Sequence, residues 1–268
     1  MKSPLLPVRP HDSHKAQFGR VGIVGGAPGM VGAALLAGRA ALKCGAGLVT
    51  LGVLDDALHV DFSAPELMFA PPARLVADPG LTVLAIGPGL GQTHAAHDLI
   101  ATALRHDAPL LMDADGLNAL AQRKDLARIC AMRAAPTLLT PHPGEAARLL
   151  DSPLQAIQSN REQAAQELAA TFNACVVLKG AGSVLARPDG TTLLNQTGNP
   201  ALSAPGMGDV LTGMLAAFLT RLEPWEALRL AVWLHGQAAD DAVADQLGPE
   251  GLTASELIGL IRRRLNAV

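Results

Sequence analysis

A carboxylate at the end of a glycine-rich turn is the strongest candidate for chemistry in this sequence. Asp209 follows Gly206 and Gly208, and a helical pattern begins there and runs to Arg221. Glycines let backbone amides turn towards a ligand, and a helix N-terminus carries partial positive charge, so the turn predicts an anion site suited to phosphate. Asp209 is then either a general base beside a transferring phosphoryl group or a simple helix N-cap. The turn alone favours the cap.

A lysine elsewhere in the chain points to the same chemistry. Lys179 follows the apolar run 175–178 and precedes a small-residue loop, Gly180, Ala181, Gly182 and Ser183. A strand over that run would aim Lys179 at the ligand edge of a sheet, and the glycines would allow close approach of a phosphate or ribose. The alternative is a surface lysine at a strand end. We favour the ligand interpretation.

Four further polar side chains have open interpretations. His142 lies in a proline-bracketed turn and is either a ligand contact or structural. Glu145, three residues later, could simply begin the next helix, where acidic residues are favoured. Asp113 and Asp115 could hold Mg²⁺ through water, or could accept hydrogen bonds from nearby backbone amides.

Five glycine-rich or polar segments each follow a predicted strand, at 25–29, 87–91, 113–115, 140–145 and 179–183. Apolar runs alternate with helical patterns, which predicts a parallel sheet covered on both faces. The carboxyl ends of parallel strands meet at one edge, where α/β proteins bind ligands, and this convergence favours the base interpretation of Asp209. We expect strands at 20–24, 48–53, 81–86, 110–112, 137–139 and 175–178, a hairpin at 184–187 and 191–194, and helices at 31–44, 95–105, 126–134, 154–171, 209–221, 226–244 and 255–265.

The expected fold is a three-layer α/β/α sandwich with a mostly parallel sheet, in one domain over residues 1–268 with an irregular arm over 1–18. A closed (β/α)8 barrel also suits the length. The hairpin and the mostly helical C-terminal third argue against the barrel.

Composition excludes several classes of function. Charged residues make up 17% of the chain and the formal net charge is -3, so no nucleic-acid footprint is visible. No apolar run approaches the roughly 20 residues needed to span a bilayer, and the N-terminus lacks a signal-peptide core. Cys44, Cys130 and Cys175 are widely spaced, which is typical of reduced cytosolic thiols. The sequence therefore predicts a soluble, cytoplasmic enzyme.

Several well-known motifs are absent. The segment 25–29, Gly-Gly-Ala-Pro-Gly, does not fit GxGxxG, and no acidic residue closes the second strand as a dinucleotide fingerprint requires. The sequence contains no GxxxxGK[ST], no GxSxG elbow and no HExxH. His235 lies in the middle of a predicted helix, and we interpret it as a packing residue or as support for the site.

Eight segments, in order, resemble those of the ADP/ATP-dependent NAD(P)H-hydrate dehydratases. They cover nearly the whole chain, at 25–37, 40–49, 87–91, 113–118, 140–145, 179–183, 197–200 and 208–213. The resemblance implies a ribokinase-like fold and repair of hydrated nicotinamide cofactors. (S)-NAD(P)H hydrate would become NAD(P)H while ADP, the usual nucleotide of bacterial members, becomes AMP and phosphate; ATP is the alternative nucleotide. Mg²⁺ would bridge the nucleotide phosphates.

The resemblance also implies roles for individual residues and partners. Ala34, Gly91, His142 and Asp209 would contact the hydrated cofactor. The adenine nucleotide would contact Lys179, Gly180, Ala181, Gly182, Ser183 and Gly208. The family suggests a homo-oligomer, such as a tetramer. This chain is too short to include the N-terminal epimerase domain of many bacterial members, so we expect a separate epimerase.

One loop departs from the family pattern. Ala201 and Pro205 stand where the family usually has glycine, and Met207 stands where it has threonine. These changes restrict the backbone and remove a hydroxyl donor. Two alternatives remain. A small-molecule kinase of the same fold, which phosphorylates an alcohol, would share the anion site and the base. The altered loop suggests the other, a non-catalytic nucleotide-binding regulator. The turn at His142 and the start of the first helix favour the dehydratase.

Overall fold

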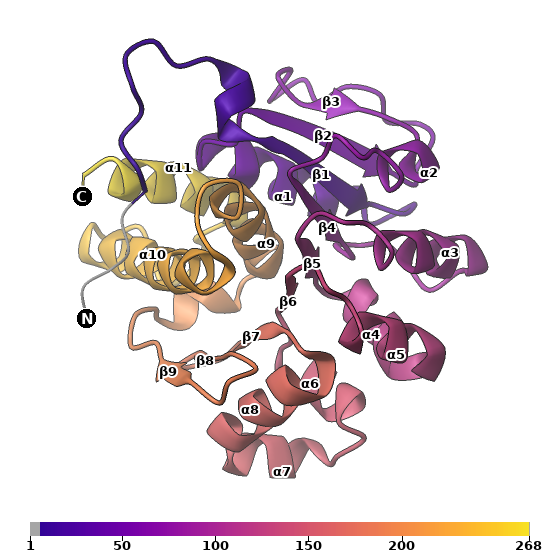
Figure 1. Cartoon of the computed structure of the whole chain (residues 1–268). Helices are drawn as coiled ribbons and strands as arrows, with labels where there is room; N and C mark the ends of the chain where they lie inside the picture. The colour runs from indigo at the N-terminus through magenta and orange to yellow at the C-terminus, as the bar shows by residue number, and fades with distance from the viewer. Residues whose placement is uncertain (1–5, 268) are drawn as a thin grey trace.

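A nine-stranded sheet runs through the middle of the molecule, in a computed structural model that describes residues 6–267 (Figure 1). The strand order is β3-β2-β1-β4-β5-β6-β7-β8-β9; the strands from β3 to β7 are parallel, and β8 and β9 are antiparallel. The open edges exclude the barrel and confirm the sandwich. The strands are β1 (Arg20–Gly25), β2 (Leu48–Val53), β3 (Met68–Phe69), β4 (Val83–Ile86), β5 (Leu110–Met112), β6 (Thr137–Leu139), β7 (Cys175–Leu178), β8 (Val184–Ala186) and β9 (Thr192–Leu194).

Helices cover both faces of the sheet, and each face has its own apolar core (Figure 1). This double cover explains why the central strands are continuous apolar runs rather than alternating ones. One layer contains α1 (Val31–Lys43), α9 (Met207–Phe218), α10 (Pro224–Ala244) and α11 (Ala254–Leu265). The other contains α2 (Pro72–Leu75), α3 (His94–Ala103), α4 (Asp115–Gln122), α5 (Lys124–Ala131), α6 (Pro143–Leu149), α7 (Leu154–Ser159) and α8 (Arg161–Phe172).

Most predicted elements are present, and the differences have local causes. The helix expected over 154–171 is divided at Asn160, whose side chain accepts a hydrogen bond from the Gln163 amide and caps α8. The arm expected to be irregular over 1–18 ends in a 3-10 helix, Lys15–Phe18, with Phe18 buried; residues 1–5 lie outside the described part. Helices α4 and α6 were not predicted. Each begins soon after a strand, in a segment whose polar residues obscure the helical pattern.

Two properties bear on the excluded functions. No helix among residues 6–267 is both long and apolar enough to cross a membrane. The three cysteines are free, and burial raises the pKa of the Cys44 and Cys130 thiols to about 12, so neither is a reactive thiolate near neutral pH.

Helices α1 and α9 pack backbone against backbone at Gly213. A Cβ atom there would lie 2.0 Å from the Ala37 carbonyl oxygen and 2.8 Å from the Ala40 Cβ. Since α9 carries the glycine-rich turn at its N-terminus, this contact helps to fix the height of the turn above the sheet.

We expect Gly213→Ala to destabilise the protein by about 1–3 kcal/mol, because the added methyl forces two helices apart in a close-packed core. The matched control is Gly259→Ala on the exposed face of α11, where a Cβ atom meets nothing within 4 Å. That control should be stabilised by about 0.5–1 kcal/mol through helix propensity. Urea unfolding of both variants measures the difference, and equal stabilities would contradict the packing argument.

Candidate active site

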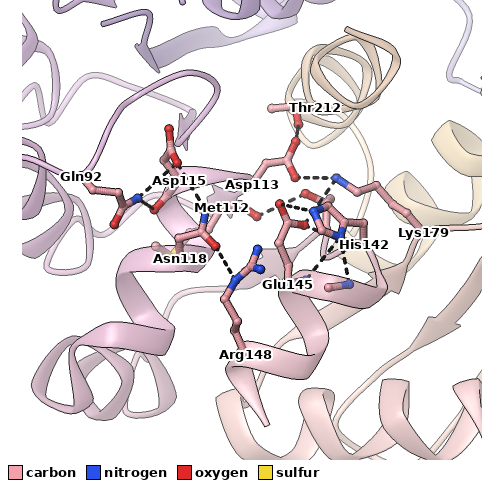
Figure 2. A network of polar contacts seen from close by, with 12 residues as sticks. Gln92, Met112, Asp113, Asp115, Asn118, His142, Glu145, Arg148, Lys179 and Thr212 are labelled. Atoms are coloured by element: carbon pink, nitrogen blue, oxygen red, sulfur yellow. Dashed lines mark hydrogen bonds and ion pairs between the residues drawn. The ribbon is translucent and has the colours of Figure 1, made fainter. Parts of the chain in front are cut away.

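Charged side chains converge at the carboxyl edge of the sheet, as the parallel topology predicts (Figure 2). Asp113 follows β5, Glu145 follows β6 and Lys179 follows β7. Asp209 joins them from the first turn of α9, and the pKa of Lys179 responds to its charge. Strands and helix therefore assemble one cluster from residues 96 positions apart in the chain (209 − 113).

Lys179 and Asp113 form the central ion pair of this cluster. The Lys179 Nζ lies 2.8 Å from the Asp113 Oδ1, and the Thr212 Oγ1 donates to the other carboxylate oxygen at 2.9 Å. Burial alone would raise the pKa of Asp113, but the charge and hydrogen bond of Lys179 hold it below its ordinary value. Asp113 is thus an ionised anchor for Lys179.

Asp113 and Asp115, the two aspartates considered above as possible Mg²⁺ ligands, both accept hydrogen bonds from protein donors. Asp115 accepts from the Gly91 amide at 2.8 Å and from the Gln92 and Asn118 side-chain amides (Figure 2). Asp115 therefore accepts from a backbone amide, as the second interpretation above proposes, whereas Asp113 accepts from the side chains of Lys179 and Thr212 instead. Across residues 6–267, no group of three or more His, Cys, Asp or Glu side chains could hold a metal.

Lys179 lies directly against the N-terminus of α9. A Cβ atom on Gly208 would be 3.4 Å from the Lys179 Nζ, so glycine at this position lets the ammonium reach the first turn. Burial disfavours the charged lysine, yet Asp113 and Glu145 together raise its pKa. An ammonium beside the positive end of a helix favours an anion between them.

Gly206 opens α9 in a left-handed conformation, with φ 86°. A Cβ atom there would lie 2.5 Å from Leu36 Cδ1, so the turn requires glycine on two counts. Gly206 is the N-cap, and Asp209 is the third helical residue with no capping bond from its side chain. The helix therefore begins two residues earlier than predicted, and the N-cap interpretation of Asp209 is wrong.

Asp209 has an unusually weak acidity for an aspartate. Burial raises its pKa to about 7, the negative charge of Asp113 adds to this effect, and Lys179 opposes it. A carboxyl group with a pKa near neutrality can be a proton acceptor whose basicity matches the operating pH.

His142 and Glu145 cap α6 reciprocally. The His142 Nδ1 accepts from the Gly144 and Glu145 amides at 3.0 and 3.3 Å, and the Glu145 Oε2 accepts from the His142 amide at 2.7 Å. Glu145 lies in the first turn of α6, which is the helix-start interpretation considered above, and it also lies 3.9 Å from the Lys179 Nζ. The His142 Nε2 also lies 3.3 Å from the Glu145 Oε1, but the side chain remains 50% exposed, so a ligand can still reach the ring.

A cavity of about 400 Å³ adjoins this cluster. All six residues expected to contact the adenine nucleotide line it: Lys179, Gly180, Ala181, Gly182, Ser183 and Gly208. Residues that the sequence did not single out for the site line it too, among them Asn195, Leu202, Leu211, Val232 and Gly236. These come from the 195–203 loop, α9 and α10. Apart from Asn195 they are small or apolar, so their side chains give no chemical signal in the sequence.

His235, which the sequence places in the middle of a helix, also lines this cavity. Its buried ring donates from Nε2 to the Met207 carbonyl at 3.1 Å. Burial lowers the pKa of His235 to about 4, so the ring is neutral near pH 7. His235 therefore holds the first residue of α9 through this hydrogen bond, which is consistent with the packing or supporting role expected for it.

The expected contacts of the hydrated cofactor lie apart from this cavity. Gly91 has φ 76° and lies against the turn before α1, where a Cβ atom would be 3.6 Å from the Ala27 Cβ. Ala34 is fully buried in α1 under that turn, so a direct contact would require the turn to move.

The atypical loop is held by side chains. Asp240 on α10 accepts from the Gly198 amide at 2.9 Å and from the Asn199 Nδ2 at 3.0 Å. Ala201 is buried in a short 3-10 helix, Pro200–Ser203, and the Met207 side chain is 3% exposed in the core. Met207 thus contributes its backbone, rather than its side chain, to the turn.

Comparison with known proteins identifies one family. The sequence model described as NAD(P)H-hydrate dehydratase matches residues 21–263. The chain is 38% identical to the ADP-dependent (S)-NAD(P)H-hydrate dehydratase of Neisseria meningitidis, over 98% of this chain and 90% of that protein. It is 41% identical to a bifunctional NAD(P)H-hydrate repair enzyme of Moorella thermoacetica, over 96% of this chain but 51% of that protein. It therefore spans about half of such bifunctional relatives.

Solved structures agree with the sequence match. The ADP/ATP-dependent NAD(P)H-hydrate dehydratase of Bacillus subtilis, co-crystallised with ATP and Mg²⁺, superposes with a TM-score of 0.85 at 36% identity, covering 98% of this chain and 94% of that one. Hydroxyethylthiazole kinase of Pyrococcus horikoshii has a TM-score of 0.66 at 17% identity, which shows a shared fold alone. The fold is thus the ribokinase-like one expected.

We expect Asp209→Asn to stabilise the protein increasingly between about pH 4 and about pH 7. In the wild type the unfolded carboxyl ionises near its ordinary pKa while the folded one stays protonated until about 7, so stability is lost as pH rises through this window. The asparagine avoids that loss, which for a shift of this size is at most about 4 kcal/mol. Urea unfolding from about pH 5 to about pH 8 measures it, with the exposed Asp107→Asn as control. A difference independent of pH would contradict the raised pKa.

Proposed function

Because the chain belongs to the NAD(P)H-hydrate dehydratase family, we propose that it dehydrates (S)-NAD(P)H hydrate to NAD(P)H while ADP becomes AMP and phosphate. The observation that supports this best is the half-buried Asp209, with its pKa near 7, next to the Lys179 ammonium and the open first turn of α9. A proton acceptor and a phosphate site lie side by side there, as transfer of a phosphoryl group to a hydroxyl requires.

Phosphorylation would solve the chemical difficulty of the reaction. Hydroxide is a poor leaving group near neutral pH. In our proposal the hydrate hydroxyl attacks the terminal phosphoryl group of ADP, Asp209 takes the hydroxyl proton, and AMP leaves as the phosphorus–oxygen bond to it breaks. The ring-nitrogen lone pair then expels phosphate from the ring carbon, and loss of a ring proton completes the double bond.

The surrounding groups would stabilise the charge that moves in this transfer. The amides of residues 206–209 and the Lys179 ammonium offer fixed positive charge at the N-terminus of α9. The loop 179–183 and Gly208 would hold the nucleotide, with either ADP or ATP as donor. The described side chains do not form a metal site of their own, so Mg²⁺ would be held mainly by phosphate oxygens and water, where it neutralises phosphate charge.

The hydrated cofactor would lie on the other side of Asp209, against Gly91 and His142, with Ala34 beneath the adjoining turn. Family membership disfavours the alcohol kinase. An intact Asp209 and Lys179 argue against a non-catalytic regulator despite the altered loop. We further propose that the protein works in the cytoplasm as a homo-oligomer, such as a tetramer, beside a separate epimerase and without nucleic-acid or membrane partners.

Two substitutions should distinguish the role of Asp209 as proton acceptor from the role of Lys179 in nucleotide binding. Asp209→Asn should lower kcat for hydrated NADH at least about a hundredfold, because it removes the proton acceptor, while ADP affinity stays within about threefold. Lys179→Met should weaken ADP binding at least about tenfold, because the phosphate loses its cation. Loss of hydrate absorbance with ADP, with ATP and with neither, together with calorimetric ADP binding, measures both. Near-normal turnover of the asparagine variant would overturn the proposed mechanism.

The pH dependence should follow the same carboxyl group. We expect kcat/KM to rise with pH and to level off above about pH 7, because Asp209 accepts a proton only when ionised and its pKa is about 7. Steady-state rates from about pH 5 to about pH 8 test this, with hydrate and enzyme stability checked at each pH. A flat profile would rule out Asp209 as the base.

A further inference from the structure

A second hollow, of about 670 Å³, lies behind α10, between the N-terminal arm, the end of α1 and helix α11. None of its lining residues is acidic, and four are basic: Arg9, Lys43, Arg221 and Arg262. Leu230 and Trp233 form an apolar side of the same hollow. The volume lies in the range of about 300–1,000 Å³ that is usual for small-molecule sites.

Two of the arginines share one aromatic ring. The Arg9 guanidinium carbon is 3.8 Å from the centroid of the Phe18 ring, and that of Arg221 is 5.6 Å from it. The Arg221 Nε is buried with no hydrogen-bond partner, and no ion pair to Arg221 occurs within residues 6–267. Burial and the nearby Arg9 lower the pKa of Arg221. Holding two guanidinium groups against one ring without a carboxylate costs electrostatic free energy, and a bound anion would reduce that cost.

Helix capping does not account for Arg221. The last carbonyls of α1 are already satisfied by the backbone: the Gly45 amide donates to Leu42 at 3.0 Å and the Ala46 amide to Ala41 at 3.1 Å. The Arg9 Nη2 donates a hydrogen bond to the Gly45 carbonyl at 2.5 Å. The negative end of α1 explains a cation such as Lys43 in its last turn, but not a second guanidinium with an unused donor.

The hollow is separate from the proposed nucleotide cavity but shares a wall with it. Leu230, Trp233 and Leu234 face the hollow, while Val232, His235 and Gly236 line the cavity at Lys179. At 100° per residue these two sets lie on opposite faces of α10. A ligand in the hollow would therefore contact neither Lys179 nor Asp209.

We propose that this hollow is a second ligand site, which binds a small molecule carrying phosphate groups. Guanidinium groups match phosphate oxygens in pairs, and Arg221, whose Nε has no partner, lines this hollow together with three other basic side chains. Lys43 and Arg262, both exposed at the rim, would meet further phosphate oxygens. The site is independent of the dehydratase reaction, so its occupancy and that reaction can be tested apart.

Pyrophosphate binding, measured by calorimetry in a Lys179→Met background, tests the proposal, because that substitution weakens the nucleotide cavity. We expect Arg221→Gln and Arg262→Gln each to weaken the remaining binding at least about tenfold. The exposed Arg74→Gln, which removes the same charge on α2, should leave it unchanged. Lys43→Gln and Arg262→Gln alter exposed side chains, so they remain informative if Arg221→Gln does not fold.

Two results would overturn the proposal. One is the absence of any pyrophosphate binding in the Lys179→Met background at millimolar concentration. The other is binding that the Arg262 and Lys43 substitutions leave as strong as the Arg74 control does. Hydrate turnover by Arg262→Gln in the wild-type background, measured alongside, distinguishes loss of this site from failure of the dehydratase assignment.

Discussion

The ion pair between Lys179 and Asp113 ties the carboxyl ends of β7 and β5 together beneath the first turn of α9. Thr212 takes the second Asp113 oxygen, so the pair also fixes the rotation of α9. Burying two charges costs desolvation that apolar side chains would avoid, so stability alone does not explain the pair. Its consequence is a cation fixed in place before any ligand arrives, which is the preorganisation that charge-stabilising sites need.

Burial contributes most to the basicity of Asp209, and the ion pair adjusts it. Burial raises the pKa of Asp209, the negative charge of Asp113 raises it further, and Lys179 lowers it, with the balance at about 7. The protein gives up stability at this carboxyl group as pH rises from about 4 to about 7, as functional sites commonly do.

Much of this arrangement follows from sequence because it depends on local pattern. The strands β2, β5, β6 and β7 have the predicted bounds, since strands buried on both faces must be continuously apolar. The convergence of Lys179 and Asp113 at one edge follows from parallel topology, but their pairing depends on side-chain geometry across 66 residues. Likewise, periodicity places His235 in a helix, yet its partner, the Met207 carbonyl, belongs to another helix. The start of α9 was misplaced because a left-handed Gly206, not Asp209, caps it.

The unusual loop shows how tertiary contacts can replace glycine freedom. Thr197 donates to the Trp233 carbonyl at 3.0 Å, and a Cβ atom on Gly236 would lie 2.2 Å from the Thr197 Oγ1. Together with the hydrogen bonds that Asp240 accepts from Gly198 and Asn199, this contact holds the 195–200 loop against α10. A loop fixed by its neighbours needs little backbone freedom of its own, so alanine at 201 and proline at 205 are compatible with the cavity. The position of α10 then determines the shape of that cavity, and the opposite face of the same helix forms the wall of the basic hollow.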